Sequence, residues 1–146
     1  MAGAMADYLE NKLIDHIFRA TSYTAGANIY VALFTAAPSD TGGGTEVSGG
    51  SYARVALNPS TSNWRNTQNS GTGASTGTSG QTSNASTITF AAPTANWGTI
   101  THVALIDASS SGNYLFWGAL TNSKTVNNGD AAPSFATDAL VVQIDS

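Results

Sequence analysis

The chain has 146 residues, a net charge of −4 and no cysteine. This length corresponds to a single domain, residues 1–146, and the missing cysteines exclude disulfides, thiolate catalysis and Cys-ligated zinc. We expect no nucleic-acid partner, because phosphate binding requires clustered Lys and Arg and the five basic residues are scattered. No apolar run approaches the roughly 20 residues of a membrane span, so no membrane partner is expected.

The N-terminal segment is predicted to form the one strong helix, at residues 7–20. Asp7 and Glu10 have the spacing of a capping box at the start of a helix. Apolar residues follow at helical spacing and make one stripe, Leu9, Leu13, Ile14 and Ile17. The stripe must dock either on the β-core or on another chain. Tyr8 and Phe18 lie off the stripe, so they need a second contact within the chain or a partner.

Two further regions, residues 28–57 and 87–146, are predicted to form a β-core. The clearest element is a hairpin whose strands, 100–107 and 114–120, flank a Ser/Gly/Asn turn. Both strands are apolar on both faces, which places the hairpin in the middle of a packed β-structure. Shorter strands are expected at 28–35, 51–57, 87–90 and 139–144. The predicted fold class is all-β, a β-sandwich or jelly-roll-like domain with one N-terminal helix.

Residues 58–86 are predicted to form an extended polar arm. In the stretch 60–87, 14 of 28 residues are Ser or Thr, and such a composition cannot bury enough apolar area to offset its own ordering entropy. Trp64, next to Arg65, is its only aromatic residue. The pair is interpreted in two ways, as an interface anchor or as a pin that holds the arm on its own domain.

No motif for chemistry stands out. The two histidines, His16 and His102, accompany no nucleophile elbow, and no metal-binding spacing occurs. We therefore expect no catalytic residues, no metal, no cofactor and no enzyme activity. One alternative is a sugar-stacking surface made from five aromatic residues, Tyr52, Trp64, Trp97, Tyr114 and Trp117. Core packing explains Trp97 and Trp117 better, because they flank or lie in dense apolar strands.

Four segments together resemble a family of small tailed-phage virion proteins, at residues 8–17, 29–40, 45–57 and 97–130. The most specific of them is T-E-V-S-G-G-x-Y-A-R, from Thr45 to Arg54. Members are often labelled tail-fibre-like in phage genomes, and relatives are capsid cement (decoration) proteins. The resemblance implies a β-rich structural protein without enzymatic activity and carries no catalytic residues.

The resemblance leads to a main hypothesis and an alternative. In the main hypothesis the chain is a capsid cement protein that is assembled in the bacterial cytoplasm. It then lies on the outer capsid surface of the virion and bridges capsomers of the major capsid protein. In the alternative it is a tail fibre or receptor-binding tail protein that contacts other tail proteins or host glycans. Either role predicts a homo-oligomer or a lattice-bound protein. The residues expected at the partner interface are Tyr8, Phe18, Trp64 and Arg65.

Overall fold

The structure is a computed structural model that describes residues 3–67 and 73–144. The centre of the predicted arm and both chain ends lie outside these ranges. The elements in chain order are β1 (Gly3–Met5), α1 (Asp7–Phe18), β2 (Ile29–Ala36), β3 (Thr45–Glu46), β4 (Val55–Leu57), β5 (Gln81–Ser83), β6 (Ile88–Thr89), β7 (Gly98–Ile106), β8 (Tyr114–Val126), β9 (Ser134–Phe135) and β10 (Val141–Gln143).

An antiparallel six-stranded sheet forms the centre of the molecule. Its strand order is β1-β8-β7-β2-β3, and β4 also pairs with β2. The predicted hairpin is confirmed as β7 and β8, which lie inside the sheet, because β1 covers the outer edge of β8 and β2 covers that of β7. Since residues 100–106 and 114–120 of the hairpin are apolar on both faces, this interior position is the one that the sequence requires.

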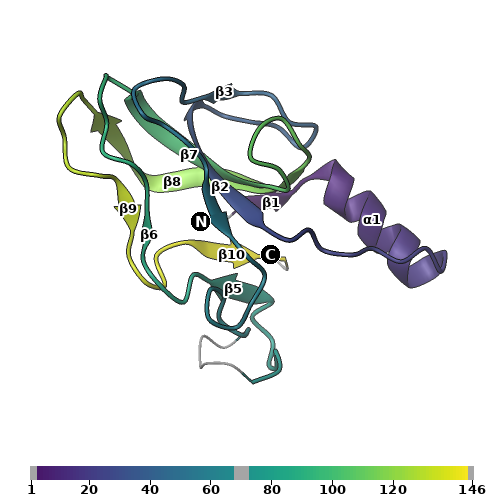
Figure 1. The fold of residues 1–146 in the computed structure, drawn as a ribbon. Coiled ribbons are helices and arrows are strands. Elements are labelled where there is room, and N and C mark those ends of the chain that lie inside the picture. Colours follow the sequence, from purple (N-terminus) through teal and green to yellow (C-terminus); the bar gives the residue numbers. More distant parts are fainter. Residues whose placement is uncertain (1–2, 68–72, 145–146) are drawn as a thin grey trace.

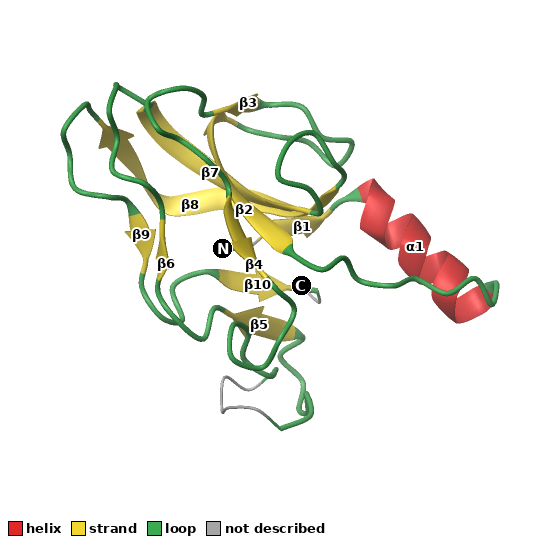
Figure 2. Cartoon of the chain, viewed as in Figure 1, coloured by secondary structure: helices red, strands yellow, loops and turns green. Residues whose placement is uncertain are grey.

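Two small ribbons, β5–β10 and β6–β9, pack on one face of this sheet (Figures 1 and 2). Alternate residues of the central strands point into the space between the layers, where they meet apolar side chains of the ribbons. This main core includes Leu33, Val103 and Leu105 from the sheet and Phe90 and Leu140 from the opposite layer. The all-β class is therefore confirmed, as one large sheet faced by two ribbons.

Loops cover the opposite face of the sheet. Phe34, Ala104 and Ile106 are buried there in a second, smaller core. The loop after β2 lies over it, with the Tyr114 hydroxyl donating to the Gly43 carbonyl at 3.0 Å and the Trp117 indole donating to Asp40 at 2.9 Å. Both faces of the central strands are thus covered, although only one faces a β-layer.

Helix α1 is shorter than predicted, and its cap differs. It ends at Phe18 rather than residue 20, and the capping-box prediction is wrong because Asp7 is already helical. Ala6 occupies the N-cap position without a side-chain cap, and its carbonyl accepts the amides of Leu9 and Glu10. The two acidic residues still lie in the first turn, where the helix dipole favours negative charge. No helix among the described residues is long and apolar enough to cross a membrane.

The predicted arm is partly built into the domain, which corrects the extended interpretation of residues 58–86. Its C-terminal part forms β5, which pairs with β10. The next residue, Asn84, is fully buried, and its side chain binds the backbone of Ser86, Ala136 and Leu140 at 2.8 Å each. Backbone and amide hydrogen bonds supply the order that apolar side chains do not. Residues 73–78 remain exposed.

Candidate partner-binding surface

Helix α1 extends away from the β-body (Figures 1 and 2). Only its base packs tightly: Leu9 is buried, and Tyr8 and Leu13 lie partly buried against the main core. The chain then returns beside the helix towards β2, and the Tyr23 amide donates to Nδ1 of His16 at 3.2 Å. Of the two docking partners expected for the stripe, the β-core or another chain, the β-core covers its N-terminal half.

The outer side of α1 is apolar and exposed. Ile14, Ile17 and Phe18 are 50%, 64% and 79% exposed. Together with Glu10 they follow the spacing i, i+4, i+7 and i+8, which places all four on one side of the helix. We call these four residues the outer helix face. A buried Ile or Phe side chain stabilises a contact by roughly 1.5–3 kcal/mol, so this face is suited to a protein partner.

The four predicted interface residues fall in two separate places, and only Phe18 is well exposed. Tyr8 is partly buried at the base of α1, with the Lys12 ammonium 5.6 Å from its ring centre. Trp64 packs partly buried against the main core, beside β5. Arg65 pairs with Asp138 at 3.1 Å. A hydrogen bond from Ser83, and to a smaller extent one from Arg65, holds the pKa of Asp138 below its ordinary value.

These contacts favour the second interpretation of Trp64, as a pin for its own domain. The indole lines a hollow of about 450 Å³ that also contains Phe116 and Thr82. Its Nε1 atom is buried, and no hydrogen-bond partner reaches it in the described part of the chain. The polar arm is held by this one large apolar side chain and by the ribbon that follows it.

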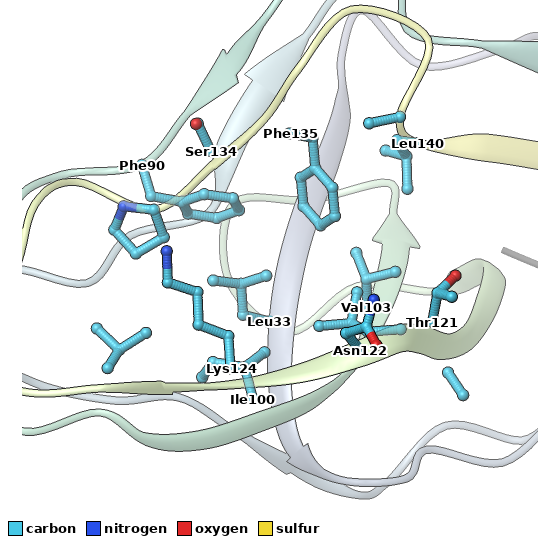
Figure 3. A pocket seen from close by; sticks show the side chains of 15 residues that line it. Leu33, Phe90, Ile100, Val103, Thr121, Asn122, Lys124, Ser134, Phe135 and Leu140 are labelled. Atoms are coloured by element: carbon cyan, nitrogen blue, oxygen red, sulfur yellow. The ribbon is translucent and has the colours of Figure 1, made fainter.

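An apolar hollow of about 250 Å³ opens between β8 and the segment that carries β9 (Figure 3). Leu120, Phe135 and Leu140 line it together with the floor residues Ile100 and Val103. Lys124 lies toward one end of the hollow and Leu140 toward the other. We call this hollow the β8 groove. Its lining makes it the second surface on which an apolar partner would bury area.

A bulge in β8 builds one wall of this groove. His102 pairs with Ala119 and Ile100 pairs with Lys124, so one residue of β7 faces four residues of β8, 120–123. Such an insertion bends the strand and redirects its side chains. The groove could not be predicted from the sequence. Neither the pattern of apolar and polar residues within β8 nor the sequence of the distant segment 131–140 indicates that the two lie opposite each other.

The T-E-V-S-G-G-x-Y-A-R segment forms a charged network at the edge of the sheet. Arg54 donates two hydrogen bonds to Glu46, both 2.8 Å long, and the Tyr52 hydroxyl donates to the same carboxylate at 3.0 Å. That hydroxyl also accepts the Leu33 amide at 2.9 Å. The Glu46 carboxylate raises the pKa of Arg54 and burial raises that of Tyr52, so both groups stay protonated and keep donating.

This network also explains a shortened strand. The predicted strand 51–57 is only Val55–Leu57, because Ser51 adopts φ +65° in a turn and Tyr52 and Arg54 bind side-chain and loop partners instead of a ladder. The segment closes the loop between β3 and β4 onto the sheet and onto the turn of the hairpin. Its role in this structure is architectural.

The residues considered for chemistry also have structural contacts. Nδ1 of His102 lies 2.8 Å from the Thr101 hydroxyl, and its ring packs against Trp117 at 6.4 Å. Within residues 3–67 and 73–144, no three His, Asp or Glu side chains are placed to hold a metal ion. Trp97 is buried, as expected from core packing, and donates to the Gly50 carbonyl at 2.9 Å.

Comparison with known proteins identifies the family. Residues 4–143 match the family model described as podophage GP4 fiber I protein gp80. The chain belongs to this family. The predicted resemblance to phage virion structural proteins is thereby confirmed, since the gp80 family match runs from within β1 to the end of β10. No curated protein matches the chain. The gp80 family supports a virion structural protein and does not by itself place the chain on the capsid or the tail.

Proposed function

We propose that this protein is a structural component of the fibre assembly on a phage tail, where it acts by protein–protein contact. The observation that carries the proposal is the outer helix face, an apolar surface extended away from a packed β-body, in a chain whose family is named for a podophage fiber protein. An extended apolar helix face is a common way to bind a protein groove. Three apolar side chains exposed together on one helix face are typical of an interaction site rather than of a self-contained surface.

We also propose that the protein has no catalytic activity. Both imidazoles make structural contacts, His16 with the Tyr23 amide and His102 with Thr101 and Trp117. The β8 groove and the hollow beside Trp64 are lined mainly by apolar side chains, and among the described residues neither contains the paired titratable groups that acid–base chemistry requires. These features support a protein that works by binding.

The second candidate is the capsid cement protein of the main sequence hypothesis, with the major capsid protein as its partner. The exposed Ser/Thr/Gly stretch at residues 73–78 favours it, since an extended segment can cross a neighbouring subunit. Binding of host glycans has less support. Tyr52 and Trp97, two of the five aromatic residues considered for sugar stacking, pack on each other with ring centres 5.4 Å apart in and against the main core, so these two rings are not free to stack on a sugar.

Purified particles distinguish the two placements. Quantitative mass spectrometry should give a copy number close to that of the portal protein, and gold-labelled antibody should mark the tail. A copy number close to that of the major capsid protein, with label over the whole head, would instead establish the cement role. Binding of the isolated protein to host cells, abolished by removal of surface polysaccharide, would favour the receptor-binding alternative.

The attachment surface is tested separately on the same particles. Phe18→Ser should lower the amount of protein per particle. Ile144→Ser is the matched control, because Ile144 is 66% exposed and lies outside α1. Equal loss with both variants would refute the role of the outer helix face in attachment.

A further inference from the structure

The outer helix face and the β8 groove are complementary, although they lie far apart on one chain. The face presents two isoleucines and a phenylalanine, and the groove is lined by apolar side chains, with Phe135 over Val103. A cavity of about 150 Å³ lined by Leu, Ile and Phe accommodates a benzene ring. The groove, at about 250 Å³, has room for the ring of Phe18 and part of a second side chain.

Charge is complementary as well. Among the described residues that line the groove, Lys124 alone is charged, and Glu10 is the charged residue of the outer helix face. The three ion pairs of the described residues involve neither of them. Glu10 and Phe18 are about 12 Å apart along the helix axis. With Phe18 toward the Leu140 end, the carboxylate points to the end where Lys124 lies (Figure 3).

The helix does not reach the groove of its own chain. Figure 1 shows α1 on one side of the β-body, while β9 and the adjoining part of β8 lie on the other. A contact between these surfaces therefore joins two copies. Each copy supplies one helix and accepts another, which is a heterologous, head-to-tail contact that closes into a ring or continues as a filament.

We propose that α1 of one copy docks in the β8 groove of a second copy, with Phe18 in the apolar hollow and Glu10 paired with Lys124. The occupant is a second copy because one chain carries both surfaces, each left uncovered by residues 3–67 and 73–144 and each matching the other in polarity and charge. This self-association is a property of the isolated protein. It does not depend on whether the particle carries the protein on its tail or its capsid.

Sedimentation velocity over a concentration series tests the contact. The wild-type protein should associate as its concentration rises. Phe18→Ser, on the helix, and Ala139→Trp, which fills the groove from an exposed position, should each raise the apparent dissociation constant roughly tenfold or more. Ile144→Ser is the control and should associate like the wild type. Circular dichroism and melting verify that each variant is folded.

Mixing distinguishes this geometry from every other self-association. A copy with Phe18→Ser keeps its groove, and a copy with Ala139→Trp keeps its helix, so the two together should form a one-to-one dimer that does not extend. Charge reversal gives an independent test. Glu10→Lys and Lys124→Glu should each weaken association, and the double variant should restore it. A monomeric wild type, normal association of Ala139→Trp, or no restoration in the double variant would overturn the proposal.

Discussion

Replacing Arg54 is the strongest test of the charged network that the T-E-V-S-G-G-x-Y-A-R segment forms at the edge of the sheet. Its side chain is only 7% exposed and donates four hydrogen bonds: two to Glu46, one to the Ala108 carbonyl at 2.6 Å and one to the Ser111 carbonyl at 2.8 Å. Arg54→Met preserves the aliphatic stem and removes all four. The substitution leaves the Glu46 carboxylate hydrogen-bonded to the Tyr52 hydroxyl, but it removes the positive charge that was paired with this carboxylate.

The expected loss follows from the burial of both partners. Removing one partner of a buried ion pair costs about 3–5 kcal/mol, because the other charge stays uncompensated. The Glu46 side chain is 26% exposed, so water offsets part of this penalty, and we expect about 2–4 kcal/mol. For a domain of this size, each kcal/mol lowers Tm by roughly 2–4 °C, which gives a fall of about 4–16 °C.

Urea denaturation, with the slope m unchanged, measures the effect. Arg65→Met is the matched control, because it also breaks an Arg–Asp/Glu pair, but one whose side chains are 29% and 43% exposed. An exposed pair contributes about 0–1 kcal/mol. The combined Glu46→Gln and Arg54→Met variant should lose less than the sum of the single losses. If Arg54→Met costs no more than Arg65→Met, the network does not hold the sheet edge as argued.

Three further predictions use matched positions. Gly44→Ala should destabilise more than Gly43→Ala, by at least about 2 kcal/mol. Both have φ near +77°, but a Cβ at Gly44 meets backbone atoms at 2.8 Å and one at Gly43 meets nothing within 4 Å; equal losses would refute the clash. Trp97→Phe should lower the free energy of unfolding by about 1–3 kcal/mol more than Trp64→Phe, because only the Trp97 indole loses a hydrogen bond. Thermal melts that rank the two variants in the opposite order would contradict this prediction. The lowered pKa of Asp138 means that its contribution to stability is present above the pKa of the unfolded chain, near 4, and is lost as the pH falls through the folded value. Asp138→Asn should therefore weaken the acid dependence of urea stability, and an unchanged pH profile would refute that assignment.

The central hairpin could be predicted because its signal is local. Two apolar runs on either side of a Ser/Gly/Asn turn specify antiparallel pairing, and apolar residues on both faces specify an interior position. The helix was predicted for the same reason, by the spacing of its apolar residues. Periodicity identified Ile14 and Ile17 as apolar-face residues, but it could not show that the body covers only the base of the helix.

The small ribbons could not be predicted, because their partners are distant in the sequence. Gln81–Ser83 has no apolar alternation, and it becomes a strand only through pairing with Val141–Gln143. The same limit applies to the candidate interface. Trp64 was singled out for its isolation in a polar stretch, while its packing against the main core, beside the hollow that Phe116 also lines, appears only in the fold.

The placement of β2 has a consequence for how the chain folds. This strand pairs along its length with β7, yet the whole segment between Ala36 and Gly98 intervenes. Hairpins such as β7–β8 form within microseconds, whereas pairing across such a separation must first overcome loop-closure entropy. During synthesis β3 and β4 are made first and can pair with one edge of β2, but the edge that pairs with β7 stays unpaired until residues 98–106 have been made. That interval is the stage at which newly made chains are most exposed to mispairing with one another.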